Sequence, residues 1–158
     1  MQQLDEVSED LCIWMKKELS LFPYFKEEDL ADLPCFFDLV KVRAGETVCG
    51  EGDFCDYLAF IVSGRLEISK QTEFPGKNVV IGVYSRGTVM GELCLLDNHP
   101  RAVTAVALED STLVTLSRDN FNLMLEAFPE SGVKFLKGLL LAVSIRLRKS
   151  YDRLASIF

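Results

Sequence analysis

Two side chains of opposite charge lie nine residues apart in the segment GELCLLDNHPRAVT, which covers residues 91–104. Arg101 offers a planar fork of N–H donors that matches two phosphate oxygens, and Glu92 offers two acceptors suited to a hydroxyl group. Gly91 lets the backbone turn tightly or approach a ligand closely. These residue types fit a sugar phosphate, although a Glu and an Arg at this spacing more often form a surface ion pair worth about 0–1 kcal/mol.

The residues between the two charges predict a single helical turn. ELCLL is too short for a full helix, but the first N–H groups of a helical turn have no partner within it and can bind an anion. Pro100 fixes the approach to Arg101, and Ala102 begins the next extended segment. The segment therefore predicts an anion-binding turn followed by an arginine.

The elements that position this segment are predicted to be short strands. About eight are expected between residues 36 and 117, in FDLVKVR, ETVCGEGD, YLAFIVSGRLEISK (two strands about a Ser63-Gly64 corner), NVVIGVY, TVM, VTAVAL and STLVTLS. Many short strands separated by Gly, Pro and Asp turns are typical of an all-β sandwich, jelly roll or barrel. We predict a mainly β fold, an eight-stranded antiparallel β-roll of the jelly-roll type with flanking helices.

Helices are expected on both sides of the roll, within one domain covering residues 1–158. Residues 1–35 predict a helical segment, because apolar residues recur at helical steps and KEEDLADL suggests a second short helix ended by Pro34. Ser117 is a good N-cap for a helix that ends at Pro129, and a long final helix follows from about Ser131. Residues 118–158 therefore form two C-terminal helices.

Composition narrows the class of protein. The chain has 158 residues, 49% of them hydrophobic, and a net charge of −7, which argues against a nucleic-acid binder with a basic surface. The cysteine count is odd and no pair is spaced as CxxC, which favours reduced thiols at Cys12, Cys35, Cys49, Cys55 and Cys94. The acidic start is not a signal peptide, and the longest apolar run, Leu139 to Val143, is too short to span a bilayer. A soluble cytoplasmic protein is expected.

Several segments together resemble one family. GELCLLDNHPRAVTAV closely resembles the phosphate-binding cassette of the cyclic-nucleotide-binding domain family, in which G-E-[L/I]-x-L precedes a short gap and P-R-x-x-T. VRAGETVCGEGDFCDYLAFIVSGRLEISK resembles the first strands of that family, and ALEDSTLVTLSRDNFNLML resembles its last strand and following helix. The resemblance covers roughly residues 22–157. Within the family, the chain is similar to the sensor domain of catabolite activator-type regulators. Met90, where an aromatic residue is common, is a mild departure.

The resemblance implies a role for each matching residue. Glu92 would accept the ribose 2′-OH, Arg101 would pair with the exocyclic phosphate, and Gly91 would bring the backbone close. The phosphate site would be completed by backbone N–H groups of Leu93, Cys94 and Ala102. The purine and sugar would lie along the preceding strand, at Ile81, Gly82 and Val83.

The residue after the arginine bears on the choice of ligand. In the family, a Thr or Ser at this position favours cyclic GMP by bonding the guanine amino group, and Ala102 cannot make that bond. The sequence therefore favours cyclic AMP over cyclic GMP as the ligand.

The sequence gives little support for catalysis or metal binding. His99 is the single histidine and lies in a loop, so it predicts neither a base nor the several ligands of a metal site. Cys94 could be a nucleophile, but a small packed residue is the better interpretation because no histidine is positioned as its base. We predict a protein that is not an enzyme and holds no metal.

The final helix carries more apolar surface than one contact needs. Its apolar residues follow steps of four and three interrupted by one serine, at Leu136, Leu140, Val143, Leu147, Ser150, Leu154 and Ile157. In the bacterial regulators of the family the matching helix forms a parallel dimer and covers the ligand. The resemblance thus implies a homodimer in which Ser150 could bond the purine. We read the basic cluster from Arg146 to Arg153 as a solvated face.

The function predicted from these observations is that of a regulatory module. It would bind a cyclic nucleotide reversibly, and its helices would rearrange by population shift to transmit the signal to an unknown protein partner. Two alternatives stay open: an interaction module that is blind to the effector or binds another ligand, and the sensor half of a transcription regulator. No DNA-binding domain and no membrane association is expected.

Overall fold

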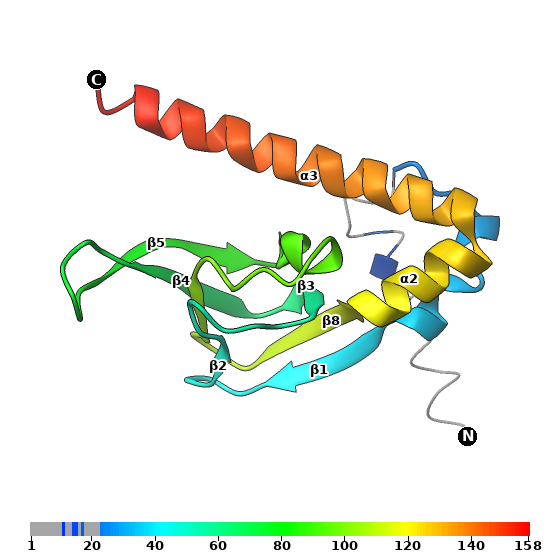
Figure 1. Ribbon diagram of the computed structural model, residues 1–158, viewed down its shortest axis with the longest axis horizontal. Helices are drawn as coiled ribbons and strands as arrows, with labels where there is room; N and C mark the ends of the chain where they lie inside the picture. The colour runs from blue at the N-terminus through cyan, green and yellow to red at the C-terminus, as the bar shows by residue number, and fades with distance from the viewer. Residues whose placement is uncertain (1–10, 12–13, 16, 18–22) are drawn as a thin grey trace. The chain divides into compact units, whose positions relative to one another are not determined.

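The computed structural model describes residues 11, 14, 15, 17 and 23–158. By its internal contacts the chain forms two compact units, one from residues 36–122 and the other from residues 1–35 with 123–158. The first unit carries all eight strands, and the second carries the long C-terminal helix (Figure 1).

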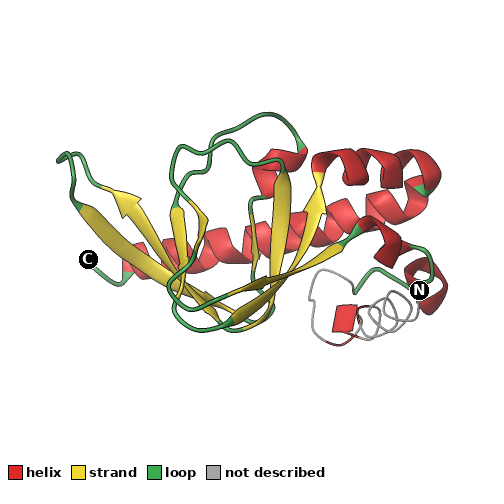
Figure 2. Cartoon of the chain, turned by 90° about the horizontal axis from the view of Figure 1, so that it is seen from below, coloured by secondary structure: helices red, strands yellow, loops and turns green. Residues whose placement is uncertain are grey.

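Eight antiparallel strands form two four-stranded sheets, as the sequence predicted (Figure 2). One sheet has the order β1-β8-β3-β6 and the other the order β2-β7-β4-β5. The strands are β1 (Asp38–Val42), β2 (Thr47–Cys49), β3 (Tyr57–Ser63), β4 (Arg65–Gln71), β5 (Asn78–Ser85), β6 (Val89–Met90), β7 (Thr104–Ala107) and β8 (Ser111–Ser117). The fold is the β-roll expected from the spacing of turns and short apolar runs.

The core of the roll lies between the two sheets. In β4 alternate residues point inward, so that Leu66 and Ile68 are fully buried together with Ile61 of β3 and Leu113 of β8. The corner between β3 and β4 is Gly64, with a φ of +89°. A Cβ there would also lie 2.7 Å from the Cα of Ser111, so this corner accepts only glycine.

The helical elements agree with the sequence in position but not always in type. The segment KEEDLADL forms a 3₁₀ turn, η1 (Glu27–Leu30), and Pro34 lies inside a second one, η2 (Leu33–Phe36), instead of ending a helix. Proline fits there because the first turn of a helix needs no N–H donor. Residues 11, 14, 15 and 17 are helical, and the rest of the predicted first helix lies outside the described residues.

The C-terminal helices match their predicted signals. Ser117 caps α2 (Arg118–Ala127), its hydroxyl accepting the N–H of Asn120 at 3.1 Å. The long helix α3 (Pro129–Ala155) begins with Pro129 in its first turn. Lys134 of this helix forms a salt bridge with Asp29 of η1, and that hydrogen bond lowers the pKa of the Asp29 carboxyl. Among the described residues, no helix combines the length and apolar character needed to cross a membrane.

Candidate functional site

The predicted single helical turn is present, and its binding of an anion stays a prediction. Gly91 follows β6 and caps η3 (Glu92–Leu95), a single 3₁₀ turn. Gly91 has a φ of +81°, in the left-handed region that favours glycine, and its carbonyl accepts the N–H of Cys94 at 3.2 Å. Glu92, the first residue of this turn, is half-buried. The turn thus begins directly after the strand that precedes it.

Arg101 is the most unusual side chain of the roll. It is 7% exposed, and its Nη2 donates a hydrogen bond of 2.6 Å to the carbonyl of Tyr57. The guanidinium lies over the Tyr57 ring, 4.9 Å from the ring centroid. Its Nε and Nη1 atoms are buried and have no hydrogen-bond partner among the described residues. A buried cation with two unused donors is arranged to receive an anion.

Gly91 and Arg101 are in direct contact. A Cβ built on Gly91 would overlap Nη1 of Arg101 and lie 2.8 Å from the Cζ of the guanidinium. Glycine is therefore required at position 91 for two independent reasons, the backbone conformation and the space that the arginine occupies. The two ends of the cassette therefore meet at this point.

The backbone of Arg101 is held by the turn before β3. Its N–H donates to the carbonyl of Asp53 and its carbonyl accepts the N–H of Gly52, each at 2.8 Å. Pro100 forms an isolated bridge with Phe54 next to this pair. Because both polar groups of the Arg101 backbone are hydrogen-bonded, the Cα atom from which the side chain extends is held in position.

A second set of bonds holds the residue that follows. Lys70 of β4 donates to the carbonyl of Ala102 and to the carboxylate of Glu51, both at 2.9 Å. Glu51 also accepts the N–H of Gln71 at 2.8 Å, and this bond, together with that from Lys70, lowers the pKa of its carboxyl. The side chain of Ala102 is exposed, so it is free to face a ligand.

The other end of the cassette is tied to α2. The Nε of Arg118, the first residue of that helix, donates to the carbonyl of Cys94 at 2.8 Å. Cys94 is 3% exposed, and burial raises the pKa of its thiol to about 11. A thiol this far from ionisation is a poor nucleophile, which agrees with the interpretation of Cys94 as a packed residue.

The strand expected to face the purine and sugar lies in the same sheet as the end of the cassette. Gly82 pairs with Ile68 of β4, which pairs in turn with Ala105 of β7. The ladder shifts between Ile68 and Ser69, and Ile81 is left as the unpaired residue of a bulge. Ile81 is 44% exposed and Val83 is 50% exposed. Their contact with a purine stays a prediction.

The remaining predicted residues lie in different settings. Leu93 and His99 are exposed, and the His99 position supports the interpretation of a solvated loop residue. Ser150 lies on α3, in the other compact unit, where its hydroxyl donates to the carbonyl of Arg146 at 3.1 Å. Its contact with a purine also stays a prediction. In the part of the chain that the structure describes, no group of three or more metal-binding side chains occurs.

Sequence reasoning missed the residues that support the arginine. Tyr57 contributes both a carbonyl and a ring, while Asp53 contributes only a backbone carbonyl, so side-chain type carried no signal for it. Lys70 and Arg118 are basic residues at a strand end and a helix start. Nothing in the sequence indicated which carbonyl each would bind.

Comparison with known proteins identifies the class. The family model of the cyclic nucleotide-binding domain matches residues 39–128. The chain therefore belongs to the cyclic nucleotide-binding domain family, in agreement with the resemblance of its cassette.

Individual relatives agree with this assignment. The chain is 36% identical over 110 residues to a cAMP-dependent protein kinase regulatory subunit of Aspergillus niger, an alignment that covers 69% of this chain and 26% of the relative. It is 30% identical over 132 residues to the cGMP-dependent protein kinase egl-4 of Caenorhabditis elegans, covering 84% of this chain and 16% of the relative. The chain thus spans about a quarter or less of the length of these two proteins.

A solved structure shares nearly the whole fold. The crystal structure of a cyclic nucleotide-binding domain from Methylobacillus flagellatus KT matches with a TM-score of 0.79 at 29% sequence identity. The match covers 99% of this chain and 85% of that chain.

The raised pKa of the Cys94 thiol predicts that it is alkylated slowly. At pH 8 we expect iodoacetamide to alkylate Cys94 at least about tenfold more slowly than the exposed Cys35, because only the thiolate reacts and burial holds Cys94 neutral. The stabilisation from the neutral thiol is present below pH 9 and is lost as the pH rises towards 11. Peptide-resolved mass spectrometry gives both rates, and chain unfolded in urea is the control. Equal rates in the folded chain would contradict the burial of Cys94.

Proposed function

We propose that this protein binds a cyclic nucleotide, with cyclic AMP preferred, and acts as a non-catalytic regulatory module. The observation that carries the proposal is the buried guanidinium of Arg101, whose Nε and Nη1 donors have no partner among the described residues. A planar pair of unused donors fits two oxygens of a phosphate. The turn η3 begins beside it, because Gly91 contacts the arginine.

The remaining groups of the ligand are assigned from the same cassette. Glu92 follows Gly91 directly, and its carboxylate would accept the ribose hydroxyl when the phosphate lies on Arg101. Leu93 and Ala102 would offer backbone N–H groups to the phosphate, and Cys94 would exchange its bond to Gly91 for one to the ligand. Val83, Gly82 and Ile81 would give an apolar edge for the sugar and purine.

The preference for cyclic AMP rests on Ala102. Its side chain is exposed and carries no hydroxyl, so it cannot accept or donate a hydrogen bond to the guanine amino group. The relatives include kinases named for each nucleotide, and only the residues of this chain favour one of them.

The output of the module is proposed to run through its helices. Arg118 joins the first turn of α2 to the carbonyl of Cys94. A movement of the cassette on binding would therefore also move the start of that helix. Ligand would favour whichever helix arrangement binds it better. On α3 and in the turn that follows it, the apolar residues of the predicted seam are exposed to 38% or more, at Leu136, Leu140, Val143, Leu147, Leu154 and Ile157. This seam is the proposed homodimer contact, with Ser150 the proposed purine contact from the second copy.

Calorimetric titration tests the binding proposal. We expect saturable heat with cyclic AMP and a weaker response with cyclic GMP. Arg101→Ala should weaken binding by about 2–5 kcal/mol, because the phosphate loses a buried charged partner. The matched control is Arg65→Ala, since Arg65 is an exposed arginine that forms a surface ion pair with Glu109 at 2.9 Å.

The control should bind cyclic AMP as the unchanged chain does. Absence of heat with either nucleotide would contradict the proposal and favour an interaction module that is blind to the effector. Equal loss in both arginine variants would show that general surface charge, and not the cassette, attracts the nucleotide.

Ala102→Thr tests the selectivity. The added hydroxyl can bond the guanine amino group, so we expect affinity for cyclic GMP to rise by about 0.5–1.5 kcal/mol while that for cyclic AMP stays within a factor of about two. Ala102→Val, which has nearly the same shape and no hydroxyl, is the control for side-chain size. A gain for cyclic GMP in both variants would show that bulk, and not the hydrogen bond, sets the preference.

The homodimer is tested by sedimentation. We expect the chain to sediment as a dimer at micromolar concentration, and Leu140→Glu with Leu147→Glu to sediment as a monomer, because each places a charge in the apolar seam. The control is Arg148→Glu, a change of charge outside the seam. A dimer in the doubly substituted chain, or a monomer throughout, would contradict the seam as the contact.

A further inference from the structure

The segment of chain that holds Arg101 in place also carries a cysteine. Cys55 is half-buried and follows Phe54, which forms an isolated bridge with Pro100. Two residues after the cysteine, the carbonyl of Tyr57 accepts the hydrogen bond from Nη2 of Arg101 at 2.6 Å. Cys55 therefore lies between two points of the chain that are joined to Arg101 or to the residue before it.

Three thiols act on the charge of the Arg101 guanidinium. Burial by itself lowers the pKa of this arginine, but side-chain contact with Cys55 and the nearby thiols of Cys49 and Cys94 outweigh burial and raise that pKa above its ordinary value. Cys49 and Cys94 are each 3% exposed, whereas Cys55 packs at the edge of the core and is half-buried. Of these three thiols, Cys55 is the one that a small molecule can reach from solvent.

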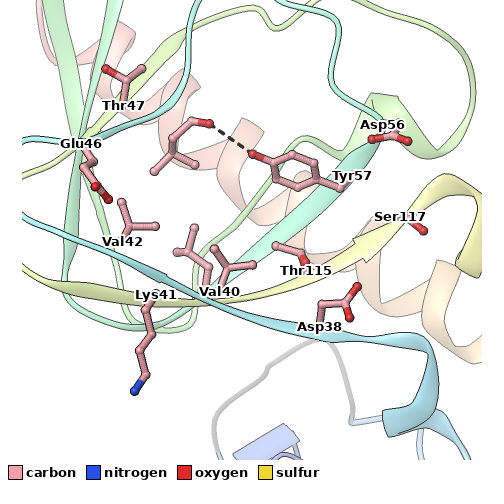
Figure 3. Close-up of a pocket in the computed structure, with 12 residues that line it drawn as sticks. Asp38, Val40, Lys41, Val42, Glu46, Thr47, Asp56, Tyr57, Thr115 and Ser117 are labelled. Carbon is pink, nitrogen blue, oxygen red and sulfur yellow. Dashed lines mark hydrogen bonds between the residues drawn. The ribbon is translucent and has the colours of Figure 1, made fainter.

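The guanidinium is held in position by Tyr57. The Tyr57 hydroxyl donates to the carbonyl of Val48 at 3.2 Å (Figure 3), and the guanidinium lies 4.9 Å from the centroid of the fixed ring. The Nε and Nη1 atoms of Arg101 stay buried without a hydrogen-bond partner among the described residues. A negative charge formed on the Cys55 side chain would therefore meet a fixed cation that has donors to offer.

Oxidation is a modification that places a negative charge one bond from the sulfur atom. A hydroperoxide converts a thiol to a sulfenic acid. With hydrogen peroxide, the sulfur attacks one peroxide oxygen, an S–O bond forms as the O–O bond breaks, and the thiol proton leaves with the second oxygen as water. The sulfur loses the two electrons that the peroxide gains. The sulfenic acid can then release its proton to solvent and become a sulfenate.

We propose that Cys55 is a modification site at which hydrogen peroxide forms a sulfenate that binds the unused donors of Arg101. The sulfenate oxygen would occupy the position proposed for the phosphate, so oxidation would prevent nucleotide binding. This consequence rests on the proposed function, whereas formation of the sulfenate does not. An added thiol would reverse the change, because it attacks the sulfenate sulfur, displaces hydroxide and forms a mixed disulfide that a second thiol reduces.

The first test follows the sulfenate in the chain without nucleotide. After exposure to hydrogen peroxide and removal of the excess with catalase, the chain is unfolded in dimedone, which marks sulfenic acid, and each cysteine peptide is measured by mass spectrometry. We expect at least about fivefold more dimedone on Cys55 than on the exposed Cys35, whose thiol donates to the carbonyl of Asp32 at 2.9 Å. Equal marking of the two, or a disulfide between Cys55 and Cys49 in place of the mark, would overturn the proposal.

Two arginine variants test the role of the guanidinium. Arg101→Met removes the charge and keeps an unbranched side chain, so the marking of Cys55 should fall to the level of Cys35. The control is Arg65→Ala, which removes an exposed arginine paired with Glu109 and should leave the marking of Cys55 unchanged. Strong marking of Cys55 in Arg101→Met would overturn the pairing of the sulfenate with the arginine.

A measurement of stability keeps the proposal testable if Arg101→Met does not fold. Cys55→Asp places a permanent carboxylate close to the position of the sulfenate, and Cys55→Asn has nearly the same shape without the charge. We expect the melting temperature of Cys55→Asp to exceed that of Cys55→Asn by about 2–4 °C, because the carboxylate gives the buried guanidinium a partner. A melting temperature that is equal or lower would overturn the site.

Calorimetry with cyclic AMP tests the consequence for binding. The unchanged chain should bind at least about tenfold more weakly after peroxide and recover with dithiothreitol, whereas Cys55→Ala should have the same affinity before and after treatment. Equal binding by chain with and without the sulfenate would overturn the regulation. No binding before treatment would overturn the proposed function and this regulation together, while the dimedone result would still judge the sulfenate by itself.

Discussion

The organisation of the roll depends on one buried positive charge that the described residues do not neutralise. Moving an ion out of water costs several kcal/mol even after the protein relaxes, and a carbonyl and an aromatic ring recover only part of that cost. Arg101 has one hydrogen bond to a carbonyl and a ring beneath it, and its Nε and Nη1 atoms have no partner among the described residues. The fold thus holds a buried positive charge whose lost hydration is only partly replaced. An anion of matching shape would stabilise that charge.

Keeping that charge in place requires support from several strands. The Arg101 backbone is bonded on both sides to the turn before β3, the next residue is bonded to β4 through Lys70, and the opposite end of the cassette is bonded to α2. Within the cassette, these supports use only backbone groups, those of Cys94, Arg101 and Ala102. The segment between its two ends, residues 96–99, is exposed and makes none of these supporting hydrogen bonds.

Much of this arrangement could be predicted from the sequence, because it depends on residues that are close together in the chain. The strands from Asp38 to Ser117 follow alternation and glycine turns, Ser117 is a cap whose bond is local, and Gly91 and Arg101 are residue types with narrow chemical use. The supports could not be predicted, because they are contacts between backbone carbonyls and residues far away in the chain, such as Arg118 with Cys94. The prediction for Pro34 was wrong because a proline can either end a helix or lie in the first turn of one, and the sequence alone does not separate the two cases.

The double requirement for glycine at position 91 has an evolutionary consequence. A descendant that no longer needed its anion could exchange the arginine without harm, and the space beside position 91 would then open. The backbone would still hold a φ of +81° there, which side chains avoid. Such a descendant would retain the glycine as a vestige of the abandoned function, so a roll that kept this glycine but lost its basic companion would be recognisable as a former receptor.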